Sequence, residues 1–178
     1  MQIQLQPADR SGSKFFRTKL LESFEQGVLD RFGDLSAAPV PSGNEIFDAL
    51  DDPDTDVFFI LADGIPAGGT IVKREKEKTY SLEILFIFKE FLNKKIGSAT
   101  WQAIEQYYPD AEIWETCTPY FERRNIHFYV NKCGFKIVEF YCEFHREEHD
   151  LTEEFKDQNN SGFFRFQKNM LENPSDPV

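Results

Sequence analysis

The chain has 178 residues, of which 40% are hydrophobic and 15% aromatic, so it is globular rather than intrinsically disordered. Its formal net charge of −11 argues against nucleic acid as a partner, because phosphates would be repelled, and is compatible with cationic amines. The three cysteines, Cys117, Cys133 and Cys142, follow no disulfide framework, and the sequence shows neither a signal peptide nor a membrane span. We therefore expect a cytoplasmic protein without a membrane partner.

The first fifty residues predict one strand followed by two helices. Polar and apolar residues alternate at 2–6, which is typical of an edge strand. Apolar residues recur at every fourth position from 14 to 32, which is typical of a helix, and Gly33 is well placed to end it. A shorter helix, capped by Ser42 or Asn44, is expected to run through residue 50.

The next segment predicts three antiparallel strands at 57–62, 67–73 and 80–88. The third of them is nearly all apolar, so we expect it to be a central strand that is buried on both faces. Gly68-Gly69 in the second strand indicates a bulge or a close approach of another backbone.

The remainder of the chain predicts two helices and three strands. The helices are expected at 94–108 and within 123–132, and the strands at 112–117, 135–144 and 163–170. The buried side of the longer helix is expected to carry Ile96, Ala99, Ala103, Ile104 and Tyr107, and one face of the strand at 135–144 to carry Val138, Phe140, Cys142 and Phe144. Residues 145–161 form a polar connection, and residues 173–178 are expected to be a disordered tail.

The turn between the central strand and the longer helix is a candidate anion site. A helix N-terminus offers unpaired backbone N–H groups and the positive end of the helix dipole, which suits a pyrophosphate. Gly97 allows phosphates to approach the backbone, and Lys94 and Lys95 add positive charge. An ordinary strand–turn–helix connection has the same appearance, so this pattern alone does not decide the function.

The segment Leu92-Asn93-Lys94-Lys95-Ile96-Gly97 resembles the coenzyme-A-binding motif of the GNAT superfamily of N-acetyltransferases, Arg/Gln-x-x-Gly-x-Gly/Ala. The second glycine is present as Gly97, whereas Lys95 replaces the first and Leu92 replaces Arg/Gln. Residues 113–135 are similar to the family's next strand and helix, and the order of elements matches from about residue 2 to 170.

This resemblance implies a single α+β domain over residues 1–172, often classed α/β, with a mixed, mostly antiparallel sheet of six or seven strands and helices on both faces. It also implies acetyl-CoA as the acetyl donor, no metal, and an amine of a small molecule or protein as the acceptor. The residues that it implies for coenzyme binding are Ile87, Phe88, Lys89, Leu92, Asn93, Lys94, Lys95, Ile96, Gly97, Ser98 and Asn125. The sequence leaves open whether the chain forms a homodimer.

Acetylation of an amine needs a base for the ammonium proton and an acid for the departing thiolate. Glu83 and Glu115, each within an apolar strand, are the candidate bases, although either is equally expected to face solvent. By resemblance Tyr129 is the acid, but it precedes Gly134 by five residues, where the family usually has four. Asn125 is also closer to Tyr129 than the usual coenzyme-contacting Asn, so Tyr129 could instead pack in the core.

Two other functions are compatible with parts of the sequence. His145-Arg146-Glu147-Glu148-His149 fits the inverted zinc-peptidase pattern, but it lies in an acidic connection without an apolar helical face, so we expect no zinc. The replacements at Leu92 and Lys95, with the irregular spacing of Tyr129, favour a binding or sensor module of the same fold without catalysis. Turnover of the coenzyme with a panel of amines distinguishes this module from an enzyme.

Overall fold

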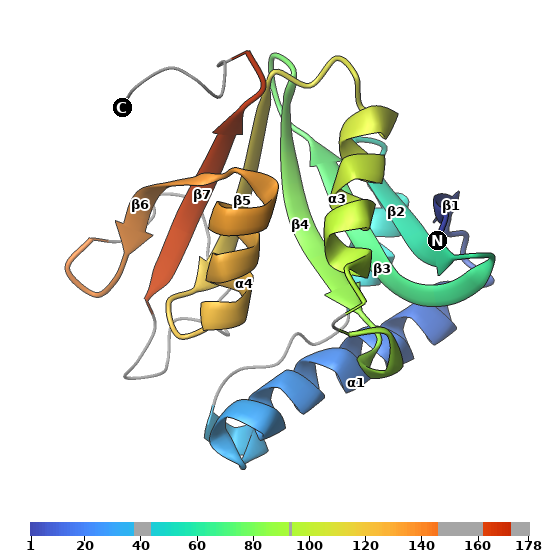
Figure 1. Cartoon of the computed structure of the whole chain (residues 1–178), viewed down its shortest axis with the longest axis horizontal. Coiled ribbons are helices and arrows are strands. Elements are labelled where there is room, and N and C mark those ends of the chain that lie inside the picture. The colour runs from blue at the N-terminus through green and yellow to red at the C-terminus, as the bar shows by residue number, and fades with distance from the viewer. Residues whose placement is uncertain (38–43, 93, 146–161, 172–178) are drawn as a thin grey trace. The chain divides into compact units, whose positions relative to one another are not determined.

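The computed structural model describes residues 1–37, 44–92, 94–145 and 162–171 (Figure 1). The strands are β1 (Ile3–Pro7), β2 (Thr55–Ala62), β3 (Ile65–Arg74), β4 (Thr79–Ile87), β5 (Ile113–Pro119), β6 (Lys136–Tyr141) and β7 (Phe163–Asn169). The helices are α1 (Ser13–Phe32), α2 (Glu45–Asp51), α3 (Ile96–Tyr107) and α4 (Arg123–Phe128), with short turns η1 (Leu35–Ala37), η2 (Lys89–Phe91) and η3 (Tyr129–Cys133). The predicted tail, Ser42, Asn93 and most of the polar connection lie outside the described residues.

Seven described strands form one sheet in the order β1-β2-β3-β4-β5-β7-β6. The pairs β1–β2, β2–β3, β5–β7 and β6–β7 are antiparallel, whereas β4 and β5 are parallel and pair from Thr79↔Ile113 to Ser81↔Glu115. The predicted α+β fold with a mixed, mostly antiparallel sheet is confirmed. None of the helices in the described ranges is both long and apolar enough to cross a membrane.

The chain divides into two compact units that interleave in sequence. Unit 1 comprises residues 1–74 and 82–109, and unit 2 comprises residues 75–81 and those from 110 onward. The division therefore falls within β4, whose first three residues belong to unit 2 and whose remaining residues belong to unit 1. The single domain over residues 1–172 stays a prediction, and each unit is described by itself below.

Unit 1 carries helices on both faces of its strands. On one face, Phe16 and Leu20 of α1 pack with Val57, Ile71 and Phe86 from three strands. On the other face Ile96, at the start of α3, packs with Ile60 and Ala62 of β2, and Figure 1 shows α3 in front of these strands. Burying apolar side chains on both faces stabilises the part of the chain that holds the end of β4 in place.

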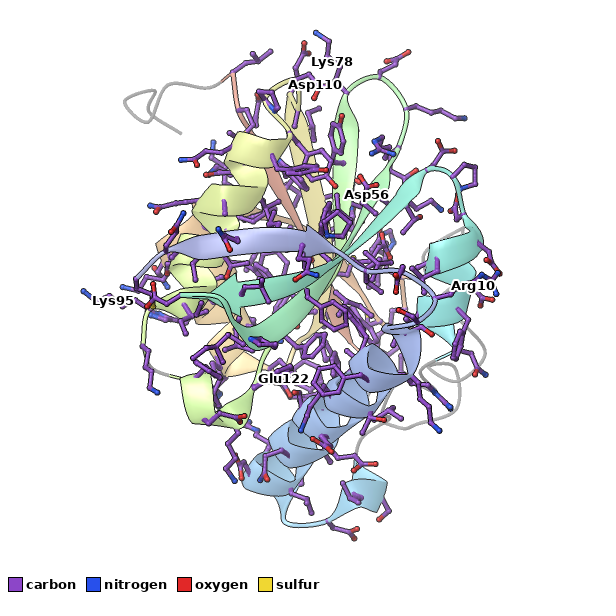
Figure 2. The ribbon with its side chains drawn as sticks, turned by 90° about the vertical axis from the view of Figure 1, so that its right-hand side faces the viewer. Arg10, Asp56, Lys78, Lys95, Asp110 and Glu122 are labelled. Atoms are coloured by element: carbon purple, nitrogen blue, oxygen red, sulfur yellow. The ribbon has the colours of Figure 1, made fainter. Side chains whose placement is uncertain are left out.

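The buried side of α3 differs from the prediction. Its buried residues are Ile96, Thr100, Trp101 and Ile104, whereas Tyr107 is 49% exposed and Ala99 and Ala103 are only half-buried. The predicted buried side omitted Trp101 and included Tyr107 in place of Tyr108. Tyr108 is the buried one, and its hydroxyl donates a hydrogen bond of 2.7 Å to Asp56 of β2. Asp56, which is labelled in Figure 2, also forms an ion pair with Arg74, so these contacts connect the end of α3 to β2 and β3.

The expectation that the central strand is buried on both faces is also wrong. Tyr80, Leu82 and Phe86 of β4 are buried, but Glu83 is exposed and Ile87 is only half-buried. In unit 1, Phe86 points into the core against α1, and Ile87 packs partly against the cluster around Ile96. Burial therefore alternates along β4, and the less buried face carries the charged side chain of Glu83.

Unit 2 packs α4 and η3 against one face of β5 and β7. The most buried side chains of this unit are Tyr80, Trp114, Thr116, Thr118, Tyr129, Cys133, Phe135 and Phe166. β6 ends at Tyr141, and the pairing of β6 with β7 shifts between Ile137 and Glu139. A bulge changes which face each later side chain points to, so the single face predicted for 135–144 is wrong. Phe144, which was assigned to it, is 89% exposed.

Candidate active site

In unit 1 the site begins where β4 ends. The N–H of Phe88 donates a hydrogen bond of 2.8 Å to the carbonyl of Ala67, which places that edge of the strand against β3. Backbone groups of successive strand residues point to opposite edges, so the N–H and carbonyl of Ile87 face the edge of β4 that is turned away from β3. The Phe88 side chain is 5% exposed and lies in the core, and Lys89 opens the short turn η2. Any coenzyme contact of Ile87 and Phe88 is thus expected from the backbone, whereas the side chain of Lys89 is exposed.

The turn that follows leads into α3 through a left-handed residue. Lys95 has φ 61° and ψ 12°, makes no side-chain cap, and precedes the first helical residue, Ile96. Glycine adopts this conformation without strain, which accounts for the glycine at this position in the resembling motif. Figure 2 shows Lys95 at the margin of the ribbon, where α3 begins.

The first turn of α3 suits an anion. Its leading N–H groups have no partner within the helix, and the turn contains no acidic side chain. Lys94 and Lys95 are exposed, and the Lys94 ammonium lies 5.2 Å from the centre of the Phe91 ring. Gly97 and Ser98 are half-buried, whereas the side chain of Ile96 is 2% exposed and lies in the core. Leu92 has no side-chain donor to contribute.

The two candidate bases differ in their surroundings. Glu83 is exposed on the unit 1 part of β4. Glu115, in unit 2, is half-buried on β5, and its Oε1 accepts hydrogen bonds of 3.0 Å from both Arg165 and Gln167. Glu115 lies directly opposite Gln167 in the ladder between β5 and β7. The sequence analysis did not identify Arg165 and Gln167 as partners of Glu115. They are two residues apart on the predicted strand at 163–170, so their side chains are expected on the same face.

Tyr129 lies in the aromatic core of unit 2. Its side chain is 7% exposed, and its ring lies 5.7 Å from that of Phe135 and 5.5 Å from that of Phe166. Burial raises the pKa of Tyr129 to about 12, although a hydrogen bond with the hydroxyl of Thr116 acts in the opposite direction. The tyrosine therefore keeps its proton at neutral pH, as an acid must, and is also packed as a structural residue would be.

The extra residue before Gly134 forms a π-helical turn. After the α-helical residues of α4, η3 has π-helical hydrogen bonding, and the N–H of Gly134 donates to the carbonyl of Tyr129 five residues earlier. Gly134 then ends the helix with φ 79°. The Asn125 amide donates a 3.3 Å hydrogen bond to the Thr118 hydroxyl on β5. The unusual spacing is therefore taken up inside the helix, and such π turns often occur at functional sites.

The described part of the zinc-like motif is not helical. The Nε2 of His145 lies 3.1 Å from Glu139 of β6, and its ring stacks on Tyr141. Glu148 and His149 lie outside the described residues. Within the ranges that the structure describes, no group of three or more His, Cys, Asp or Glu residues is arranged to hold a metal ion.

Comparison with known proteins gives a consistent result. Residues 19–135 match the model of the Acetyltransferase (GNAT) family. The uncharacterized protein YrkN of Bacillus subtilis (strain 168) is 42% identical over 173 residues, which span 94% of each chain.

Two solved structures share the fold. A Bacillus subtilis acetyltransferase in complex with CoA has a TM-score of 0.66 at 17% identity, covering 96% of this chain and 99% of that chain. The spermidine N-acetyltransferase of Vibrio cholerae, in complex with CoA and spermine, has a TM-score of 0.66 at 13% identity, covering 94% of this chain and 95% of that one.

Proposed function

Because this chain belongs to the acetyltransferase (GNAT) family, we propose that it moves an acetyl group from acetyl-CoA to a primary amine of a small molecule or protein. The acetyl-CoA-dependent transferase activity follows from the family, and the amine acceptor is the proposed part. The observation that carries the proposal is the end of β4 followed, within ten residues, by a helix N-terminus without a side-chain cap or an acid. The three free cysteines support a reducing compartment such as the cytoplasm.

The pyrophosphate of the coenzyme would bind to the first turn of α3. Its N–H groups at Ile96, Gly97 and Ser98 lack helical partners, and Lys94 and Lys95 supply positive charge. The chain departs from the family motif at Leu92, where no side chain can donate a hydrogen bond. Backbone groups and exposed lysines would therefore carry most of the binding. The positive charge near Lys94 and Lys95 suits a phosphate-bearing ligand even though the chain is acidic overall.

The backbone at the end of β4 would orient the reacting group. The N–H of Ile87 faces the edge of the strand that is turned away from β3 and would donate a hydrogen bond to the thioester carbonyl, which stabilises the negative charge that develops on that oxygen. The amine nitrogen then forms a bond to the carbonyl carbon while the bond from that carbon to sulfur breaks. The chain would form no covalent intermediate.

Proton transfers would involve the candidate carboxylates and Tyr129. We favour Glu83 as the base, acting directly or through water, because it is exposed, whereas one oxygen of Glu115 already accepts two hydrogen bonds. The Tyr129 hydroxyl, which holds its proton at neutral pH, would protonate the leaving sulfur. Asn125 is proposed to border the coenzyme, with its amide held by Thr118.

The test of coenzyme binding is a thermal-shift titration with acetyl-CoA and CoA. At a hundred times its dissociation constant a ligand adds roughly 2.7 kcal/mol to the free energy of unfolding, so a clear rise in Tm is expected. Gly97→Val should remove the response, because its branched side chain would crowd the phosphates. Gly27→Val is the matched control, since Gly27 lies in α1 with nothing within 4 Å of an added Cβ. No shift at millimolar coenzyme would contradict the binding proposal.

The test of catalysis is release of free thiol from acetyl-CoA in the presence of polyamines, amino acids and peptides with free N-termini. Acceptor-dependent release supports an N-acetyltransferase. Binding without release on the full panel would instead support the non-catalytic module, which the leucine at position 92 and the packed Tyr129 favour.

A further inference from the structure

β3 is irregular where it passes the end of β4 in unit 1. In its pairing with β2, Ile60 lies opposite Gly68, but Leu61 lies opposite Pro66, so Ala67 is an extra residue on β3. Figure 1 shows β3 between β2 and β4. The bulge therefore lies beside the β4 residues that precede the candidate coenzyme turn.

Gly68 follows this bulge and is in close contact with the β4 backbone. A Cβ added to Gly68 would lie 2.2 Å from the carbonyl oxygen of Phe86 and 3.1 Å from the Cα of Ile87. Since non-bonded heavy atoms are optimally about 3.5 Å apart, even alanine would require β4 or β3 to shift by about 1 Å. The carbonyl of Phe86 thus lies directly against the Cα of Gly68.

The neighbouring glycine has a different role. A Cβ on Gly69 would lie 2.5 Å from the ring of Phe16 and 2.7 Å from the ring of Phe86. These contacts are side-chain atoms of the core beneath α1, whereas those of Gly68 include the backbone of Phe86 and Ile87. A substitution at Gly69 therefore disturbs the packing of core side chains, whereas a substitution at Gly68 displaces the β4 backbone.

We propose that Gly68 is a positioning residue for the acetyl-transfer reaction. The Phe86 carbonyl and the Ile87 N–H belong to the same peptide group, and they point to opposite edges of β4. Because Gly68 has no Cβ, the Phe86 carbonyl can lie against the Gly68 Cα, and this contact fixes the direction of the Ile87 N–H at the edge of β4 turned away from β3. This inference rests on the proposed role of that N–H toward the thioester carbonyl.

The test compares Gly68→Ala with Gly69→Ala and with Gly27→Ala, whose position in α1 is open. A displacement of about 1 Å at a catalytic group can lower the rate by up to roughly 10²-fold. Gly68→Ala should therefore lower kcat by about 10- to 100-fold while the Kd for CoA, which is held mainly at α3, changes less than about threefold. Gly69→Ala should lower Tm but leave kcat of the folded protein near wild type. Equal kcat in the Gly68 and Gly69 variants would overturn the proposal.

A measurement without turnover separates this inference from the proposed function. In the apo protein, the amide resonances of Ile87 and Phe88 should shift in Gly68→Ala and stay in place in Gly27→Ala. In the wild type, acetyl-CoA should shift the Ile87 amide resonance more than CoA does. An unmoved Ile87 amide in Gly68→Ala would refute the positioning role even if the wild type is inactive. If Gly68→Ala does not fold, equal shifts by the two coenzymes in the wild type would refute it.

Discussion

Replacing Lys95 by glycine should make the protein more stable. Lys95 has φ 61°, and a non-glycine residue in the left-handed region is disfavoured by roughly 1–2 kcal/mol. Glycine loses this strain but adds about 0.5–1 kcal/mol of chain entropy to the unfolded state. The net gain in the free energy of unfolding is about 0–1.5 kcal/mol, or up to roughly 6 °C in Tm for a chain of this length.

Lys95→Ala provides the matched comparison, because alanine loses the charge but keeps a Cβ in the left-handed conformation. The difference in Tm between the glycine and alanine variants therefore measures the left-handed strain less the chain entropy that glycine adds to the unfolded state. Both variants remove one positive charge beside the proposed phosphate site, so both should weaken CoA binding by up to about fivefold, the scale of an exposed charge interaction. A glycine variant that is no more stable than the alanine variant would show that the strain at Lys95 does not exceed that entropy, which would contradict the prediction.

Lys78 supplies a second control, since it is also left-handed, with φ 62°, but pairs with Glu112 in unit 2. Lys78→Gly should leave the Kd for CoA unchanged, and its gain in Tm should be reduced by the loss of that exposed ion pair. A weakening of CoA binding as large as that of Lys95→Gly would mean that overall charge, rather than the turn before α3, governs affinity.

Three further predictions concern ionisable groups. Tyr129→Phe should lower kcat by about 10²- to 10⁴-fold with little change in the Kd of the coenzyme, as expected for the loss of a general acid. Full activity, with a loss of roughly 1 kcal/mol in the free energy of unfolding, would instead make Tyr129 a structural residue. Glu83→Gln should lower kcat, while Glu115→Gln should mainly lower Tm; the reverse result would exchange their roles. Because the folded pKa of Tyr129, about 12, exceeds its usual value of 10.0, its contribution to stability is complete below pH 10 and is lost as pH rises toward 12. Above pH 10 the free energy of unfolding should fall in denaturant titrations, and Tyr129 contributes up to about 1.4 kcal/mol per pH unit of that fall. Tyr129→Phe should remove this share and leave that of Tyr108, whose pKa burial also raises; an equal slope in the variant would assign the whole fall to other groups.

Local sequence patterns were sufficient for most elements of the fold. The four-residue spacing and Gly33 predicted α1, which spans Ser13–Phe32 and ends at a left-handed Gly33. The strands predicted at 57–62 and 67–73 correspond to β2 and β3, which are joined by a turn where both Asp63 and Gly64 have positive φ. These elements follow from periodicity and turn chemistry within a few residues, so the sequence alone defines them.

The errors arose where distant segments decide the outcome. Tyr107 and Tyr108 are equally apolar neighbours, and the hydrogen bond from Tyr108 to Asp56, which lies on the distant strand β2, favours burial of Tyr108. The bulge near Val138 is set by pairing with β7 and reverses the faces of the following residues. No pattern within a single strand contains either piece of information.

The candidate site was predicted unevenly for the same reason. The turn before α3 was located from sequence, and its left-handed Lys95 coincides with the departure from the family motif. The hydrogen bonds from Arg165 and Gln167 to Glu115 depend on a register between segments about fifty residues apart. Gly68 and its neighbour were correctly predicted to mark a bulge or a close approach, but the atoms involved become visible only in three dimensions.

The π-helical turn at Tyr129–Cys133 has a consequence for how relatives of this chain should be aligned. A length difference between homologues is normally placed in a loop, where extra residues can bulge outward. Here the additional residue is absorbed within a single helical turn, and Gly134 still ends the helix. An alignment that moves the gap to the preceding loop would shift Asn125 and Tyr129 by one position away from the residues that the proposed roles match them to. The proposed roles of these two residues therefore require the gap to lie between Tyr129 and Gly134.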